Sequence, residues 1–92
     1  MKLIEAVRDL ASLNEASTIY ASEPWTPSSD VVVAPEPKSG GLPEQAARLD
    51  LKYFLEVFIA RDFLEGWAAN LGKEPTLQEK CARIIAYAIT DA

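Results

Sequence analysis

Side chains that could carry out catalysis are few in this chain of 92 residues. Histidine is absent, which removes the most common general base and the most common metal ligand. The single cysteine, Cys81, lies on the apolar stripe of a predicted helix, where a thiol packs as an inert core group. Asp62 and Glu65 are three residues apart on a predicted outer helix face, and two carboxylates do not complete a hard-cation site. We therefore expect no enzyme, no cofactor and no metal site.

Two further features are chemically incomplete. Gly40-Gly41 does not open a helix with Lys-Ser/Thr, so it indicates a flexible turn rather than a phosphate-binding loop. Glu56 lies beside aromatic residues that would raise its pKa if they covered it, but one carboxylate is not a mechanism. One alternative function is a small-molecule binder, in which Glu56 and Arg61 polarise a ligand held between a sheet and a loop.

The charge of the chain is acidic and uneven. Nine basic and fourteen acidic residues give a net charge of −5, which argues against nucleic-acid binding because that affinity comes from clustered Lys and Arg. Residues 15–37 hold four acids and no Lys or Arg, a net charge of −4. This segment is either a solvated loop region or an acidic docking surface for a basic protein partner.

Trp25 lies in this acidic segment, in a loop stiffened by Pro24 and Pro27. Two interpretations remain open: the indole folds back over the core, or it anchors an interface. Our leading hypothesis is a non-catalytic protein-interaction module that presents this loop to a basic partner such as a toxin or nuclease. The candidate partner-binding residues are Glu23, Trp25, Asp30 and Glu36.

The positions of these candidate residues depend on the strands and helices, which the spacing of apolar residues predicts. Within 51–71 the spacing changes from alternation, typical of a strand, to the helical repeat of residues 60–71. A strand over 51–59 would direct Leu51 and Leu55 toward the helices and leave Phe54 and Phe58 on the other face. Exposed aromatic residues on a sheet face suggest a cover, so Phe54 and Phe58 are candidate self-association residues. A structural homodimer, formed through this face or a sheet edge, is a second alternative function.

The other elements follow from shorter signals. A helix is predicted over 2–13 from its apolar stripe, and a final helix begins at the capping box of 76–79. Strands are predicted over 18–21 and 31–34, and one helical turn over 43–48. The fold class is α+β in a single domain, 1–92: a small three-stranded, largely antiparallel sheet with helices packed on one face, in the order α-β-β-β-α-α.

The cellular location of the protein is inferred from two patterns that the sequence does not show. No run of eighteen apolar residues predicts a membrane span, and the first residues carry no pattern of a secretory signal. We therefore expect a cytoplasmic protein that contacts neither membrane nor nucleic acid.

Three motifs also resemble a family of small, uncharacterised bacterial proteins. They are Ile19-Tyr20, Glu23-Pro24-Trp25, and the run from Tyr53-Phe54-Leu55-Glu56-Val57 to Asp62-Phe63-Leu64-Glu65-Gly66-Trp67. The family shares an initial helix, a strand with a Pro-Trp loop and a strand-helix unit ending near Trp. The resemblance implies a bacterial cytoplasmic protein and carries over no catalytic or binding residue. Small acidic proteins of this kind include immunity proteins that neutralise a toxin, an analogy at the level of class.

Overall fold

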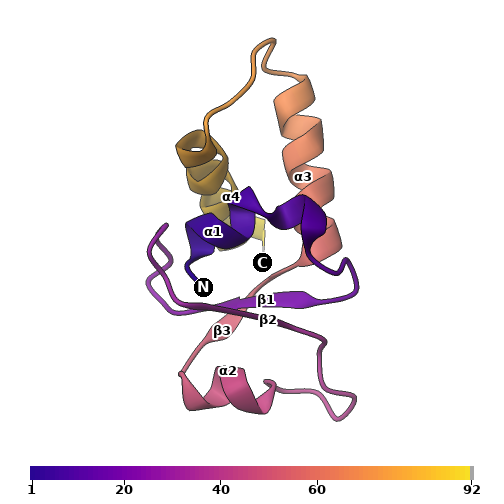
Figure 1. The fold of residues 1–92 in the computed structure, drawn as a ribbon, viewed down its shortest axis with the longest axis vertical. Coiled ribbons are helices and arrows are strands. Elements are labelled where there is room, and N and C mark those ends of the chain that lie inside the picture. The colour runs from indigo at the N-terminus through magenta and orange to yellow at the C-terminus, as the bar shows by residue number, and fades with distance from the viewer. Residues whose placement is uncertain (92) are drawn as a thin grey trace.

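A computed structural model describes residues 1–91 (Figure 1). Its α+β fold class and the order of its main elements confirm the prediction, and the helical turn predicted over 43–48 is the short helix α2. The elements are α1 (Leu3–Arg8), the 3-10 turn η1 (Leu10–Ser12), β1 (Thr18–Ala21), β2 (Val31–Ala34), α2 (Glu44–Arg48), β3 (Lys52–Glu56), α3 (Val57–Ala69) and α4 (Leu77–Asp91).

The three strands form one antiparallel sheet in the order β2-β1-β3, so β1 is central. β1 and β2 make a hairpin in which Thr18 pairs with Ala34 and Ala21 with Val31. Residues 22–30, which connect these strands, therefore lie at one end of the hairpin. The segments before Thr18 and after Ala34 lie together at the opposite end.

The sheet separates two apolar clusters of different size. The larger cluster lies between the sheet and the helices α1, α3 and α4, and Leu3, Ile19 and Ile84 are buried in it. The smaller one lies on the other face, where α2 covers the sheet and Tyr20, Leu51 and Ala46 are buried (Figure 1). Alternation along β1 explains the division, because successive side chains of a strand point to opposite faces. Three helices thus pack on one face, and the single short helix α2 lies on the other.

The junction of β3 and α3 differs from the predicted one. The strand ends at Glu56 and the helix begins at Val57, earlier than the alternating pattern indicated. The register shifts between Ile19, opposite Leu55, and Tyr20, opposite Tyr53, which leaves Phe54 as an extra residue. Such a β-bulge changes the side-chain alternation. Phe54 is therefore fully buried in the larger cluster, next to Leu55.

The expectation that Phe54 and Phe58 share an exposed sheet face is consequently wrong. Phe54 is inside the core, and Phe58 is on α3 with 47% of its surface exposed. Phe54 and Phe58 therefore do not form a shared face that a loop or a second copy of the protein could cover. Of the two candidate self-association residues, only Phe58 is accessible.

The last two helices are joined through Gly72, which has a φ of 71°, in the left-handed region that favours glycine. α4 then follows the predicted capping box, in which Thr76 and Glu79 each accept the other's backbone N–H, at 3.1 and 2.8 Å. None of the helices within residues 1–91 is long and apolar enough to cross a membrane.

Candidate partner-binding site

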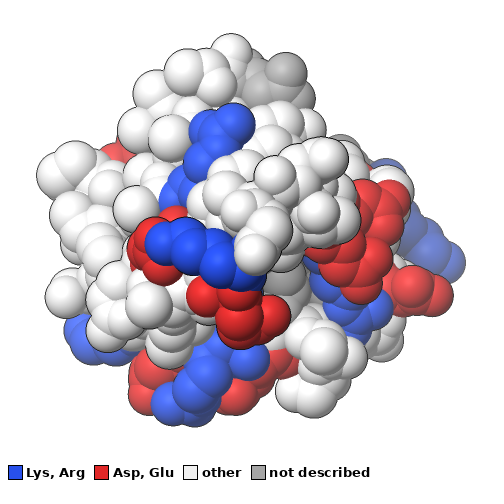
Figure 2. Space-filling model, turned by 90° about the horizontal axis from the view of Figure 1, so that it is seen from above, with Lys and Arg blue, Asp and Glu red and all other residues white. Residues whose placement is uncertain are grey.

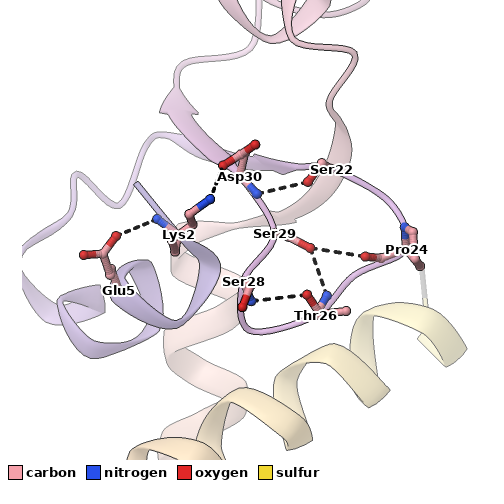
Figure 3. A network of polar contacts seen from close by, with 8 residues as sticks. All are labelled: Lys2, Glu5, Ser22, Pro24, Thr26, Ser28, Ser29 and Asp30. Atoms are coloured by element: carbon pink, nitrogen blue, oxygen red, sulfur yellow. Dashed lines mark hydrogen bonds and ion pairs between the residues drawn. The ribbon is translucent and has the colours of Figure 1, made fainter.

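The 22–30 loop is held in shape by its own polar side chains (Figure 3). Ser29 Oγ accepts the backbone N–H of Thr26 at 2.9 Å and donates to the carbonyl oxygen of Pro24 at 3.3 Å. Ser29 is buried, so both bonds are partly shielded from water. The loop is therefore a structured connection whose serines satisfy its own backbone groups.

Asp30, a predicted partner-binding residue, is already paired inside the chain (Figure 3). Its Oδ1 lies 2.7 Å from Lys2 Nζ, and its backbone N–H donates to Ser22 Oγ at 3.0 Å. The hydrogen bond from Lys2 and the charge of that ammonium group lower the pKa of Asp30. The charge of Asp30 is thus partly compensated by Lys2. Glu23, another predicted partner-binding residue, is exposed to solvent.

Trp25 folds back onto the core, which is the first of the two interpretations. Its ring meets the ring of Phe54 edge to face, with centroids 4.9 Å apart and an angle of 85° between the planes. The indole Nε1 donates a long bond of 3.4 Å to the carbonyl oxygen of Ala21. The residue is partly buried against the larger cluster. Trp25 therefore contributes to packing between the loop and the sheet.

Glu36 lies at the opposite end of the β1-β2 hairpin from Glu23 and Asp30. It follows β2 by two residues, and its Oε1 accepts the hydroxyl of Thr18, the first residue of β1, at 3.1 Å. Strands of four residues extend about 13 Å, so the four predicted residues do not form one surface. The structure separates Glu36 from the other three.

Glu36 instead joins carboxylates that the sequence pattern did not connect with it. A pocket of about 300 Å³ opens at this end of the hairpin, and we call it the acidic pocket. Its carboxylates come from the segment before β1, the segment after β2 and the last residue of β3. The lining residues are Glu15, Ala16, Ser17, Thr18, Pro35, Glu36, Glu56 and Phe58.

The backbone fixes the position of these groups. The N–H of Val57 donates to the carbonyl oxygen of Ser17 at 3.0 Å, which ties the start of α3 to the start of β1. Arg61 Nη1 approaches Glu15 at 3.8 Å, a weak ion pair at the margin of the pocket. Within residues 1–91, Glu36 and Glu56 have no ion pair. Two uncompensated carboxylates and the exposed ring of Phe58 thus share the pocket.

Two tyrosines lie close to these carboxylates. Burial raises the pKa of Tyr53, and the charges of Glu56 and Glu36 raise it further. Burial likewise raises the pKa of Tyr20, with the charge of Glu36 as the next cause. The phenol groups of both residues therefore stay protonated near neutral pH, beside an acidic surface.

A second hollow, of about 440 Å³, lies among α1, η1, α3 and α4, with Val7, Leu10 and Leu64 at its floor. The cations at its edge are already engaged: Arg8 with Asp9 at 2.9 Å and Lys80 with Glu74 at 3.6 Å. Seen from the α3-α4 end, acidic and basic side chains alternate over the surface (Figure 2). This end of the molecule therefore has no surface of a single sign.

In the small-molecule alternative, Glu56 and Arg61 polarise one ligand. Glu56 lines the acidic pocket, whereas the Arg61 guanidinium donates to the carbonyl oxygens of Leu10 and Ala11 in η1 and of Leu13 just after it. Arg61 is consequently a structural residue.

Cys81, Asp62 and Glu65 lie on the helix faces that the sequence predicts. Cys81 is fully buried, and burial raises the pKa of its thiol. Asp62 and Glu65 are exposed on α3. No group of three or more His, Cys, Asp or Glu side chains in the described part of the chain is arranged to hold a metal ion.

The acidic pocket was missed because its carboxylates are widely separated in the sequence. The sequence signal for it was partial: Glu15 and Glu36 both belong to the acidic segment 15–37. Glu56 joins them only through the pairing of β1 with β3, in which Thr18 lies opposite Glu56. Comparison with family models, curated proteins and solved structures gave no match.

Proposed function

We propose that this protein is a non-catalytic protein-interaction module that binds a basic protein partner through the acidic pocket. The observation that carries the proposal is the meeting of Glu15, Glu36 and Glu56 around exposed Phe58, with no Lys or Arg among the lining residues. Apolar contact from an aromatic ring and attraction from nearby carboxylates are features of protein interfaces.

The proposed surface differs from the acidic 22–30 loop. Asp30 is paired with Lys2, and Trp25 packs on Phe54, so that loop offers less uncompensated charge and less free aromatic area. The net charge of −5 favours encounter with a basic partner over a nucleic acid. A bacterial, cytoplasmic immunity or inhibitor protein that neutralises a basic toxin or nuclease is one instance of such a module.

The proposal is tested by affinity capture with two charge-matched variants. Glu36→Gln with Glu56→Gln removes two charges from the acidic pocket, and Glu23→Gln with Asp30→Asn removes two from the other end of the hairpin. We expect a basic partner to be captured from a lysate of the source cells by the natural protein and by the 23/30 variant. The 36/56 variant should lose it.

The capture should also weaken with added salt, because the interacting charges are solvent-exposed and screened. Trp25→Phe, which keeps an aromatic ring against Phe54, serves as a further control and should retain the partner. A partner that is retained by the 36/56 variant but lost by the 23/30 variant would move the interface to the 22–30 loop. A captured partner that is acidic would contradict the proposal outright.

A further inference from the structure

The sheet has two edge strands, β2 and β3, which differ in how they are protected. An edge strand presents unpaired backbone N–H and C=O groups, to which a further strand can add. β3 is interrupted by the bulge at Phe54 and carries the charged side chains of Lys52 and Glu56, which discourage such pairing. β2 is the apolar run Val31–Ala34, with a continuous register and no charged side chain. The β2 edge is therefore the one at which an added strand would pair more easily.

The outer side of β2 is partly occupied by the N-terminal residues. The N–H of Val31 donates to the carbonyl oxygen of Met1 at 2.9 Å, on the side of β2 away from β1. Successive residues of a strand direct their N–H and C=O groups alternately to the two sides, so Val33 also faces outward. The next outward position is that of Pro35, which has no N–H to donate.

Met1 and Lys2, which we call the strap, lie along the first part of this edge. Lys2 forms an antiparallel bridge with Asp30, and its Nζ lies 2.7 Å from Asp30 Oδ1 (Figure 3). The backbone N–H of Lys2 donates to Glu5 Oε1 at 2.7 Å, which holds the strap against the start of α1. Among the residues that the structure describes, this bridge is the only pairing on the outer side of β2.

α1 is attached to the 22–30 loop by hydrogen bonds that do not involve the strap. The N–H groups of Leu3 and Ile4 belong to the first turn of α1, where a helix leaves its donors without partners. They donate to the carbonyl oxygens of Ser29 and Pro27, at 2.9 and 3.0 Å. The strap can therefore leave the β2 edge while α1 stays in place.

We propose that the strap closes the β2 edge, so that a second copy of this chain cannot add a strand there. Of the outward positions 31, 33 and 35, only Val33 then offers an unpaired N–H, because Val31 is bonded to Met1 and Pro35 has no donor. One residue is too short for a strand, which needs about three or more.

The open edge would fit a second copy of itself. Two identical β2 edges can pair antiparallel about a two-fold axis, because such an interface is self-complementary. The run of three valines has a high preference for strands and carries no charge that would oppose this pairing. The inference goes beyond the proposed function, because it does not depend on what the acidic pocket binds.

The test compares the oligomeric state of variants by sedimentation velocity at high micromolar concentration. Lys2→Glu sets a second carboxylate against Asp30 and should release the strap, and Pro35→Thr supplies a donor at the next outward position. We expect the natural protein to be monomeric and the double variant to dimerise. The control combines Pro35→Thr with Lys38→Glu, which makes the same charge change at an exposed lysine and leaves the strap intact. This control should remain monomeric.

A third substitution locates the interface. Val33→Pro removes the one free donor of the edge, and proline is tolerated in an edge strand where the N–H faces outward. Added to the double variant, it should abolish the dimer. A monomeric double variant, or a dimer that survives Val33→Pro, would overturn the proposal. A natural protein that dimerises and loses its dimer on Val33→Pro would overturn it as well, because the edge would then be open with the strap present.

Hydrogen exchange of the natural protein, followed by NMR, tests the strap without any substitution. We expect the amide of Val31 to exchange slowly, because it is bonded to the strap, and that of Val33 to exchange quickly. In Lys2→Glu, the Val31 amide should lose this protection, whereas the Leu3 amide, bonded to the 22–30 loop, should keep it. Equally fast exchange at Val31 and Val33 in the natural protein would refute the closed edge, whether or not the variants fold.

Discussion

Thr76 and Glu79 illustrate how single residues set the local stability of this protein. The two side chains exchange hydrogen bonds with each other's backbone N–H and so satisfy two groups that a helix start leaves open. The hydrogen bonds with Thr76 and the positive charge of Lys73 lower the pKa of Glu79 below its usual value of 4.5. The cap of α4 is therefore sensitive to pH.

The sign of this dependence follows from the lowered pKa. A carboxylate whose pKa is lower in the folded state stabilises the fold above its usual pKa, and this contribution is lost as the pH falls through the folded value. We expect the difference in free energy of unfolding between about pH 7 and about pH 3 to be smaller in Glu79→Gln than in the natural protein.

The matched variant for this experiment is Thr76→Ala, which should lower stability by about 1 kcal/mol at either pH because it removes an N-cap. Urea denaturation followed by circular dichroism measures both variants. Equal pH dependence in Glu79→Gln and the natural protein would show that the Glu79 charge does not support the cap.

At the scale of elements, the β3-α3 unit decides which aromatic residues are available to other molecules. The bulge at Phe54 turns this side chain inward, and the early start of α3 places Phe58 outward. The same junction brings Glu56 opposite Thr18, at the rim of the acidic pocket. A local irregularity in one strand thus separates a core residue from a surface residue four positions later.

This arrangement predicts opposite results for two similar substitutions. Phe54→Ala leaves a cavity beneath Trp25 and should lower the free energy of unfolding by about 3–4 kcal/mol. Phe58→Ala should change it by no more than about 0.5 kcal/mol, because the ring is exposed. Urea denaturation followed by tryptophan fluorescence measures both. Similar losses in the two variants would contradict the bulged register.

At the scale of the whole molecule, Arg61 connects the N-terminal segment to α3. Its guanidinium donates to carbonyl oxygens of η1 about 50 positions earlier, with N–O distances of 3.0 Å to Leu10 and to Ala11. The molecule is elongated, with dimensions of 42 × 24 × 23 Å. One side chain that satisfies several carbonyl groups at once therefore contributes to the overall assembly.

We expect Arg61→Met to lower the stability by about 2 kcal/mol, since the substitution keeps an apolar stem but leaves partly buried carbonyl groups unpaired. Arg48→Met is the matched control, because Arg48 is exposed and, among the residues that the structure describes, forms an ion pair only with Glu44 on its own helix. The control should change stability by less than about 0.5 kcal/mol. Indistinguishable effects of the two variants in thermal and urea unfolding would argue against the bridging role.

The prediction of local structure succeeded where short-range signals were strong. Strands 18–21 and 31–34 were predicted with the bounds that the structure has, because each is a short β-branched run between turn residues. The junction near residue 57 was predicted less well. Alternation continues past the end of the strand as a pattern of residue types, and nothing in that pattern reports a bulge.

The candidate site, like the fold, could be predicted from the sequence only in part. The sequence determined that residues 15–37 are acidic and that Trp25 is either a core cover or an anchor. It could not decide between those alternatives, because the partner of Trp25 is Phe54, and their contact requires the register of β1 with β3. Nor could it bring Glu36 to Glu56, which lie 20 positions apart and meet only across the sheet.

By itself, then, the sequence determined the element types, the α+β class and the acidic character, since these depend on neighbouring residues and on composition. The tertiary structure alone decided which carboxylates share a pocket and which phenylalanine is exposed. The physical reason is that pairing between strands sets the distances between residues far apart in the chain. A one-residue shift in that pairing exchanges the inner and outer faces of a strand.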